Sequence, residues 1–93
     1  MRQNLARLPK ADLVQALHDE PNLNGCNLKN VDLSSVNLAR VNLSGARLHS
    51  ADLSGSYLHS ILGRYTSFVG ANMRGVAAPA AALEGAGFGS ANL

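Results

Sequence analysis

The side chains of this sequence that could act as nucleophiles or bases are its serines, three histidines and one cysteine. A serine hydroxyl becomes a nucleophile when a histidine takes up its proton, so this composition raises the question of hydrolysis. Four of the serines, however, stand where turns are expected and where small polar residues are common: Ser34, Ser44, Ser54 and Ser60. No acid–base pair or oxyanion site accompanies them. We therefore expect no catalytic residues and no enzyme activity.

Cysteine, histidine and glycine could instead build a cofactor site. The single cysteine, Cys26, excludes an internal disulfide, and no pair of Cys or His residues has the spacing of a zinc site. We expect Cys26 to act as a small buried hydrophobe rather than as a nucleophile. No G-x-G-x-x-G motif or phosphate-binding loop precedes a convincing helix. We therefore expect neither a metal ion nor a cofactor.

The composition predicts one small domain with an aliphatic interior. A chain of 93 residues has room for one compact core, and with 4% aromatic residues and no tryptophan that core must consist of Leu, Ala and Val. The formal charge of +2 is weak, so it attracts an anionic partner only where the cations cluster. The sequence has no apolar run of about 18 residues, and its first residues lack the apolar segment of a signal peptide. We expect a cytoplasmic protein that does not associate with a membrane.

A five-residue period dominates the chain from residue 21 onward. Its centres are Leu23, Leu28, Leu33, Leu38, Leu43, Leu48, Leu53 and Leu58, and the same register continues through Gly63, Phe68, Met73, Ala78, Leu83, Phe88 and Leu93. An α-helix turns about 100° per residue, so side chains five residues apart would scatter around it. In a flat strand they would point alternately to opposite faces. Neither element can bury this series.

A backbone that turns a corner once in every five residues can bury it. Each centre and the small or β-branched residue two positions before it would then face one axis, while the Asn or Asp just before the centre would face solvent. Buried backbone groups need hydrogen bonds, so successive turns must pair about 4.8 Å apart as a solenoid. The structural core predicted in this way is Leu23, Leu28, Leu33, Leu38, Leu43, Leu48, Leu53, Leu58, Phe68, Met73, Leu83 and Phe88.

Three repeats carry a family resemblance: V-D-L-S-S at 31–35, V-N-L-S-G at 41–45 and A-D-L-S-G at 51–55. They resemble the A(D/N)LXX signature of pentapeptide-repeat proteins, and the resemblance covers residues 21–93, less well after Leu58. It implies an all-β solenoid, a right-handed quadrilateral β-helix with four pentapeptides per turn. Leu23, Leu43, Gly63 and Leu83 would then form one interior ladder. We expect Phe68 to fill space that Gly63 leaves, or alternatively a bulge to turn Leu62 inward in its place.

The two ends of the chain differ from the repeats. Residues 1–20 form an N-terminal segment in which 9–19 read as a short helix, with Pro9 in its first turn and with Leu13 and Leu17 on one apolar stripe. We expect this helix to cap the first coil of the 21–93 β-helix and shield its unpaired edge. The alternative continues the five-residue phase through 6–20, which would bury His18 and expose Leu17. At the other end Leu93 is a repeat centre with no cap after it, so we expect either a homodimer through the last coil or continuation into a longer chain.

Two groups of outward residues are candidate binding surfaces. The group Tyr57, Leu62, Tyr65 and Val69 is unusually apolar for positions that should face solvent, and it is the best candidate partner surface. The alternative, which we favour slightly, is a local irregularity near Gly63 that folds some of these side chains inward. The group Lys29, Arg40, Arg47 and His49 could form a small basic patch, although a solvated face is the simpler interpretation.

These observations favour a non-catalytic interaction or scaffold module, the repeat portion of a bacterial protein, whose protein partner the sequence does not identify. The resemblance also implies an alternative, because some pentapeptide-repeat proteins mimic duplex DNA and bind DNA gyrase. Such mimics are expected to be acidic, whereas this chain has only six Asp and Glu residues and no continuous negative track. Direct nucleic-acid binding is not expected either, because the cations are spread over several sides with few aromatic residues among them.

Overall fold

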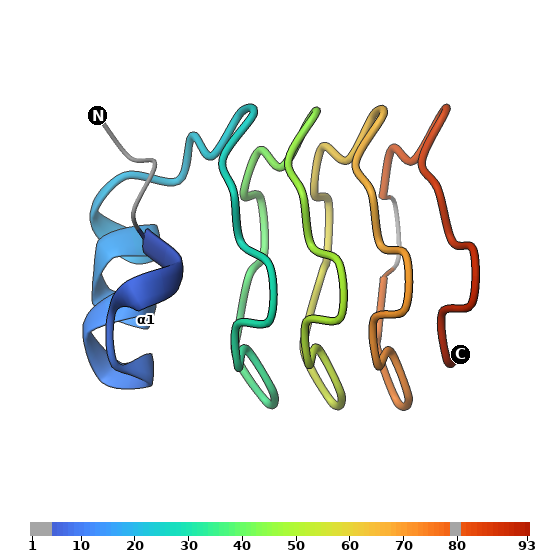
Figure 1. Ribbon diagram of the computed structural model, residues 1–93. Helices are drawn as coiled ribbons and strands as arrows, with labels where there is room; N and C mark the ends of the chain where they lie inside the picture. Colours follow the sequence, from blue (N-terminus) through green and yellow to red (C-terminus); the bar gives the residue numbers. More distant parts are fainter. Residues whose placement is uncertain (1–4, 79–80) are drawn as a thin grey trace.

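The computed structural model describes residues 5–78 and 81–93 of the chain. A short 3₁₀ turn, η1 (Leu5–Arg7), precedes one helix, α1 (Lys10–Asp19). After α1 the backbone winds into stacked coils, and α1 lies across one end of the stack (Figure 1). The extended stretches of each coil are so short that each contributes one isolated β-bridge residue rather than a long strand.

Parallel bridges join residues that are twenty apart: Asn22 pairs with Asn42, Asn42 with Leu62, and Leu62 with Ala82. Twenty residues are four pentapeptides, so each coil has four sides. We number these sides as face 1 (21–25, 41–45, 61–65 and 81–85), face 2 (26–30, 46–50, 66–70 and 86–90), face 3 (31–35, 51–55, 71–75 and 91–93) and face 4 (36–40, 56–60 and 76–78). Because the faces follow one another around the coil, face 2 lies opposite face 4.

Most corners are hydrogen-bonded turns. The N–H of Cys26 donates to the C=O of Leu23 at 3.0 Å, and the bond recurs at later corners, for example from Ala46 to Leu43 at 2.9 Å. The fifth residue of every described repeat from Gly25 to Ser90 has a φ between 56° and 73°. This is the third residue of a type II turn, where φ must be positive. The turn explains why Gly, Asn and Ser recur at the fifth position.

The Asn and Asp residues before the repeat centres have a local task. Their side-chain Oδ1 accepts a hydrogen bond from the N–H two residues later, as Asn42 does from Ser44 and Asp52 from Ser54, both at 3.0 Å. These N–H groups take no part in the bonds between coils. The preference for Asn and Asp therefore has a backbone cause, because an N–H without an acceptor is costly.

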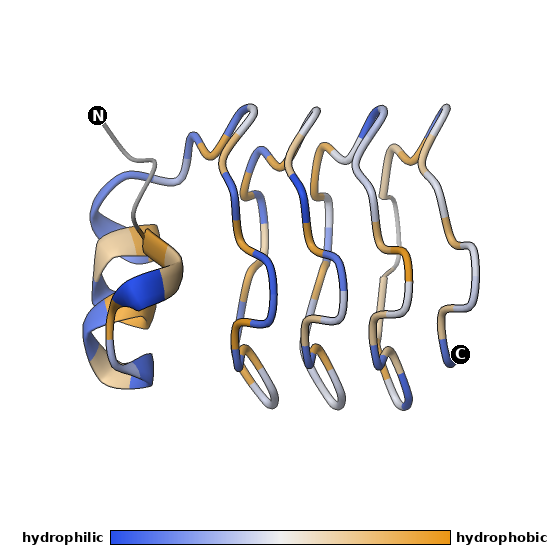
Figure 2. Cartoon of the chain, viewed as in Figure 1, coloured by the Kyte–Doolittle hydropathy of each residue, from blue (hydrophilic) through white to orange (hydrophobic). Residues whose placement is uncertain are grey.

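Backbone hydrogen bonds also join each coil to the next. The N–H of Leu43 donates to the C=O of Leu62 at 2.7 Å, and the N–H of Leu62 donates to the C=O of Val41 at 3.1 Å. Hydrophobic and hydrophilic residues alternate along the coils in the hydropathy colouring (Figure 2). Within the coils the buried hydrophobic residues are Leu23, Cys26, Leu28, Val31, Leu33, Val36, Leu38, Val41, Leu43, Ala46, Leu48, Ala51, Leu53, Leu58, Ile61, Phe68, Ala71 and Met73. Leu83 and Phe88 are half-buried against them.

The irregular position Gly63 keeps the register. Gly63 is buried and Leu62 is exposed, so the expected bulge that would turn Leu62 inward is wrong. A Cβ on Gly63 would lie 2.8 Å from Leu83 Cδ2, so the Leu83 side chain occupies the space that we expected Phe68 to fill. Phe68 instead stacks on Phe88 of the next coil, with ring centroids 5.1 Å apart and planes 7° from parallel. An aromatic stack thus continues the core toward the last coil.

Two hydroxyl groups point into the core from the position two residues before a centre. Ser56 Oγ donates to the C=O of Leu33 at 2.5 Å, and Thr66 Oγ1 donates to the C=O of Leu43 at 2.6 Å. Both residues are fully buried. Each hydroxyl is satisfied by a carbonyl of the preceding coil, which removes the cost of burying it.

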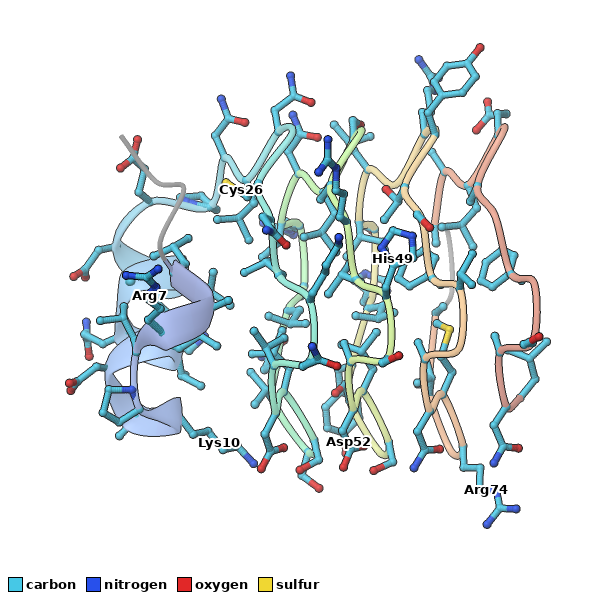
Figure 3. The ribbon with its side chains drawn as sticks, viewed as in Figure 1. Arg7, Lys10, Cys26, His49, Asp52 and Arg74 are labelled. Carbon is cyan, nitrogen blue, oxygen red and sulfur yellow. The ribbon has the colours of Figure 1, made fainter. Side chains whose placement is uncertain are left out.

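The helix α1 closes the first coil. Leu13 and Leu17 are buried against the core, and Lys10 Nζ donates to the C=O of Ser34 at 2.8 Å and to its Oγ at 3.1 Å. Figure 3 shows Lys10 extending from α1 toward the first coil. The alternative coils over 6–20 are wrong, since Leu17 is buried and His18 is exposed. Residues 1–4 of the expected 1–20 segment and residues 79–80 of the 21–93 segment lie outside the described residues. Within the described ranges, no helix is long and apolar enough to cross a membrane.

Candidate interaction surfaces

One serine and one histidine do approach each other on face 2. Ser67 Oγ lies 3.0 Å from His49 Nε2, which is the distance that a nucleophile and its base require. His49 Nδ1 is buried and has no hydrogen-bond partner among the described residues, so no carboxylate orients the imidazole. On face 3, the hydroxyls of Ser34 and Ser54 donate to their neighbouring Asp carboxylates, each at 2.6 Å, which completes a turn rather than a catalytic pair.

Metal-binding groups do not assemble in residues 5–78 and 81–93. No cluster of three or more His, Cys, Asp or Glu side chains that could hold a metal ion occurs there. Cys26 is buried in the first coil. The pKa of Asp32 is lowered because the hydroxyl and the N–H of Ser34 donate to its carboxylate and because Lys10 Nζ lies 3.5 Å from it. This ion pair connects α1 to the first coil.

The four residues of the expected apolar surface are all exposed. The exposed fractions are 59% for Tyr57, 46% for Leu62, 75% for Tyr65 and 40% for Val69. The alternative in which some of these side chains fold inward is therefore wrong. They do not form one surface, however, because Tyr57 lies on face 4, opposite Val69 on face 2. Leu62 lies on face 1, Tyr65 at the corner between faces 1 and 2, and Val69 in the turn at the far end of face 2. We call these three residues the corner surface.

Tyr65 stands at that corner in a column of glycines. Gly25, Gly45 and Gly85 occupy the same corner in the other coils. A Cβ on Gly85 would lie 2.6 Å from both Cδ1 and Cε1 of Tyr65, so the tyrosine ring lies against the backbone of Gly85 in the next coil. The absence of a side chain at residue 85 therefore lets the ring lie along the corner while most of it stays exposed.

The four residues of the expected basic patch do not all lie on one face either. Lys29, Arg47 and His49 share face 2, whereas Arg40 ends face 4 and is separated from face 2 by the whole width of face 1. Lys29 and Arg47 are the only charged residues in 26–30, 46–50, 66–70 and 86–90, apart from His49, so face 2 carries a formal charge of +2. That value equals the net charge of the chain. The patch prediction was wrong for Arg40.

The last coil leaves part of the apolar interior open. A hollow of about 350 Å³ is lined there by Met73, Gly75, Val76, Ala78, Leu83, Phe88 and Leu93. Leu83 and Phe88 are repeat centres that another coil or a second molecule would cover, as their counterparts in earlier coils are covered. Dimerisation or continuation through this end stays a prediction.

Sequence reasoning missed two residues on face 2. Gly87 and Gly89 flank the inward Phe88, with Gly87 in the extended part of the face and Gly89 in the turn that ends it, one residue before the fifth position. The signal was visible as a G-F-G triplet around a repeat centre, where the pattern favours Asn or Asp before the centre.

The repeat pattern and the four-sided coils agree with one family of known proteins. A family model described as pentapeptide repeats, in eight copies, matches residues 22–59 and 42–76, which together make up more than half of the chain. The chain belongs to the pentapeptide repeat family. No curated protein matches this pentapeptide repeat chain.

Solved structures with similar coils are themselves pentapeptide repeat proteins. One from the cyanobacterium Cyanothece is 27% identical, with a TM-score of 0.70, over 71% of this chain and 45% of that chain. One from the thylakoid lumen of Arabidopsis thaliana is 17% identical, with a TM-score of 0.41, over 68% of this chain and 61% of that chain. HetL, involved in heterocyst differentiation regulation in the cyanobacterium Nostoc, is 28% identical, with a TM-score of 0.31, over 75% of this chain and 37% of that chain.

Of these three structures, the Cyanothece protein is the one with a TM-score above 0.5. This pentapeptide repeat chain spans less than half of that protein's length. The predicted fold is confirmed: this is a right-handed quadrilateral β-helix. Pentapeptide repeat proteins are generally structural or interaction modules. The function is therefore to be sought on the outer faces.

Proposed function

We propose that this pentapeptide repeat chain is a non-catalytic interaction module that binds a protein partner at the corner surface, Leu62, Tyr65 and Val69. The observation that supports the proposal is Tyr65, which is 75% exposed and has a φ of 59°. A side chain in this left-handed conformation costs about 1–2 kcal/mol, and glycine occupies the same corner in the other coils. A strained and exposed aromatic ring contributes little to folding but is a common anchor for a protein partner.

The neighbours of Tyr65 extend this apolar area. Leu62 precedes it on face 1, and Val69 follows it on face 2, both exposed. Arg64 NH2, on the same face as Leu62, lies 3.6 Å from a carboxylate oxygen of Glu84, so charge at this corner is partly neutralised. Apolar residues with a polar rim are typical of protein interfaces.

Mimicry of DNA, with gyrase as the partner, is the alternative that the family resemblance raises, and the placement of the carboxylates disfavours it. Asp32 and Asp52 stack on face 3, but the next residues of that column are Asn72 and Asn92, which are neutral. Arg74 lies on the same face. A negative track comparable with a DNA backbone would need carboxylates through all the coils.

A crosslinking comparison tests the proposal. The photoreactive residue benzoylphenylalanine replaces Tyr65 in one variant and Tyr57 in the other, because Tyr57 is also an exposed tyrosine but lies on face 4. After irradiation in the source cells, we expect one discrete protein adduct from position 65 and none from position 57. Excess wild-type protein should compete for the adduct, and a Tyr65→Ser/Val69→Ser double variant should not.

The outcomes separate the candidate functions. Absence of an adduct from both positions, or equal adducts from both, contradicts the corner surface as the partner site. A DNA-supercoiling assay with gyrase runs in parallel, with Arg47→Glu as the charge-reversal control. Inhibition or protection of gyrase at micromolar protein would replace the proposal with the gyrase alternative.

A further inference from the structure

Two of the nine glycines have no structural reason to be glycine. Six glycines lie at corners with φ between 69° and 73°, and a Cβ on Gly63 would collide with Leu83 at 2.8 Å. Gly87 and Gly89 lack a left-handed φ. A Cβ on Gly87 would meet nothing within 4 Å, and one on Gly89 would meet only Val69 Cγ2 at 3.9 Å. The fold would therefore accept side chains at both positions, and their absence needs another explanation.

The missing side chains leave a flat area on face 2 of the last coil. Phe88, between the two glycines, points inward and stacks on Phe68. Val69, exposed on the preceding coil of the same face, lies beside Gly89, while Ser67 of that coil pairs with Gly87. We call Val69, Gly87 and Gly89 the glycine shelf. Its one side chain is the apolar Val69, and no other shelf side chain keeps a partner away from the backbone of the two glycines.

The shelf also presents a backbone donor. In repeats with Asn or Asp before the centre, the side chain accepts the N–H two residues later, as Asp52 does from Ser54 at 3.0 Å. Gly87 cannot do this, and the N–H of Gly89 has no acceptor among the hydrogen bonds of the described residues. An exposed N–H without a side chain over it favours an approaching acceptor such as a carboxylate or a carbonyl.

The opposite end of face 2 is cationic. Lys29 and Arg47 are exposed and form no ion pair with any described residue, whereas Lys10 pairs with Asp32 and Arg64 with Glu84 on other parts of the surface. Face 2 contains no carboxylate at all. A ligand lying along this face would therefore meet two unneutralised cations at one end and an apolar shelf at the other.

We propose that face 2 binds an extended acidic segment of a partner protein. The carboxylates of the segment lie over Lys29 and Arg47, a bulky apolar side chain lies beside Val69 on the glycine shelf, and a backbone carbonyl of the segment accepts the N–H of Gly89. Adjacent coils are about 4.8 Å apart, so the three spacings from Lys29 to Gly89 measure about 14 Å, which about five extended residues span. This inference rests on the proposed function and specifies the chemistry of the partner.

A nucleic acid fits face 2 less well than an acidic peptide. Single-stranded nucleic acids bind where aromatic side chains alternate with cations, so that bases can stack. The outward residues beside Lys29 and Arg47 are Asn27, His49 and Ser67, and among the described residues the only tyrosine or phenylalanine that points outward near the face is Tyr65 at its corner.

Selection from a displayed library of random dodecapeptides tests the inference. The bait is the full chain, and we expect the enriched peptides to combine two or more acidic residues with a bulky apolar residue. Their affinity should fall by about tenfold or more in Gly87→Leu/Gly89→Leu, which fills the shelf, and in Lys29→Glu/Arg47→Glu. The matched controls Ala77→Leu and Arg40→Glu alter exposed residues of face 4 and should leave the affinity unchanged.

Each other outcome overturns the inference. Failure to enrich any peptide, enrichment of neutral or basic peptides, or affinity that survives filling of the shelf contradicts it. Tighter binding of a single-stranded oligonucleotide, with a steep loss of affinity as salt rises, would assign the face to nucleic acid. The Cβ positions at 87 and 89 are open, so Gly87→Leu/Gly89→Leu should retain the circular dichroism spectrum of the wild type. If the partner crosslinked at position 65 still binds Gly87→Leu/Gly89→Leu, the proposed function as an interaction module stands, and only the proposed binding of an acidic segment on the glycine shelf is refuted.

Discussion

Replacing Gly85 by alanine should destabilise the protein more than the same replacement at Gly45. Both glycines occupy the corner between faces 1 and 2, with φ values of 73° and 72°. Alanine in this conformation destabilises the folded state by about 1–2 kcal/mol. About 0.5–1 kcal/mol of this loss is offset because the unfolded chain has fewer conformations with alanine than with glycine. Gly45→Ala should therefore cost about 0.5–1 kcal/mol, since the nearest atom to its Cβ is 3.9 Å away.

The ring of Tyr65 adds a second cost at Gly85. The Cβ of Gly85→Ala would lie 2.6 Å from Cδ1 and Cε1 of Tyr65, so the ring must leave its position. Forcing a side chain away from its rotamer costs about 0.5–1.5 kcal/mol, which brings the total loss for Gly85→Ala to about 1–2.5 kcal/mol. Each kcal/mol lowers the melting temperature of a domain of this size by about 4–8 °C. Urea unfolding followed by circular dichroism measures the two losses.

A double-mutant cycle decides whether Tyr65 is the cause. In a Tyr65→Ser background, Gly85→Ala and Gly45→Ala should lose equal stability, because only the shared backbone cost remains. Equal losses already in the wild-type background, or an extra loss at Gly85 that persists without the ring, would refute the placement of Tyr65 against Gly85.

Two further predictions concern the core and the cap. Leu43→Ala should lower the free energy of unfolding by about 2–5 kcal/mol, because removal of this fully buried side chain leaves a void between Leu23 and Gly63. Urea titrations measure the loss, and a value below about 1 kcal/mol would contradict the inward position of Leu43. The pKa of Asp32 is lowered from its ordinary value of 3.8, so its stabilisation is present above that pH and is lost as the pH falls through the lowered value. Melting temperatures recorded at decreasing pH should fall more steeply for the wild type than for Asp32→Asn, and parallel curves would show that Asp32 does not contribute.

The inward positions were predictable because they repeat a local pattern. A leucine in every fifth position excludes a helix and a flat strand, and the same spacing places Asn or Asp where a turn N–H needs an acceptor. The helix 9–19 was also readable, and the structure places it at Lys10–Asp19. Its apolar stripe, with Leu13 and Leu17, could be buried only against the open edge of the first coil.

The surface was less predictable. Leu62, Tyr65 and Val69 keep the outward positions that the repeat register gives them, so the favoured alternative of inward folding was wrong. Tyr57, close to them in sequence, lies on the opposite side of the solenoid from Val69. Arg40 was grouped with Arg47 although a whole face separates them. Residues in one stretch of a coiled chain face different directions, so nearness in sequence does not imply a shared surface.

The sequence by itself determined which side chains point inward and where the backbone turns, because both depend on interactions within one five-residue repeat. The repeat alone left open which residues become neighbours in successive coils, since no single repeat contains the number of repeats per turn, and the ladder of Leu23, Leu43, Gly63 and Leu83 followed only from the family resemblance. Only the tertiary structure showed that the Leu83 side chain, rather than Phe68, fills the space beside Gly63, and that the ring of Tyr65 lies against Gly85. Both contacts join residues twenty positions apart, where the hydrogen bonds between coils set the register.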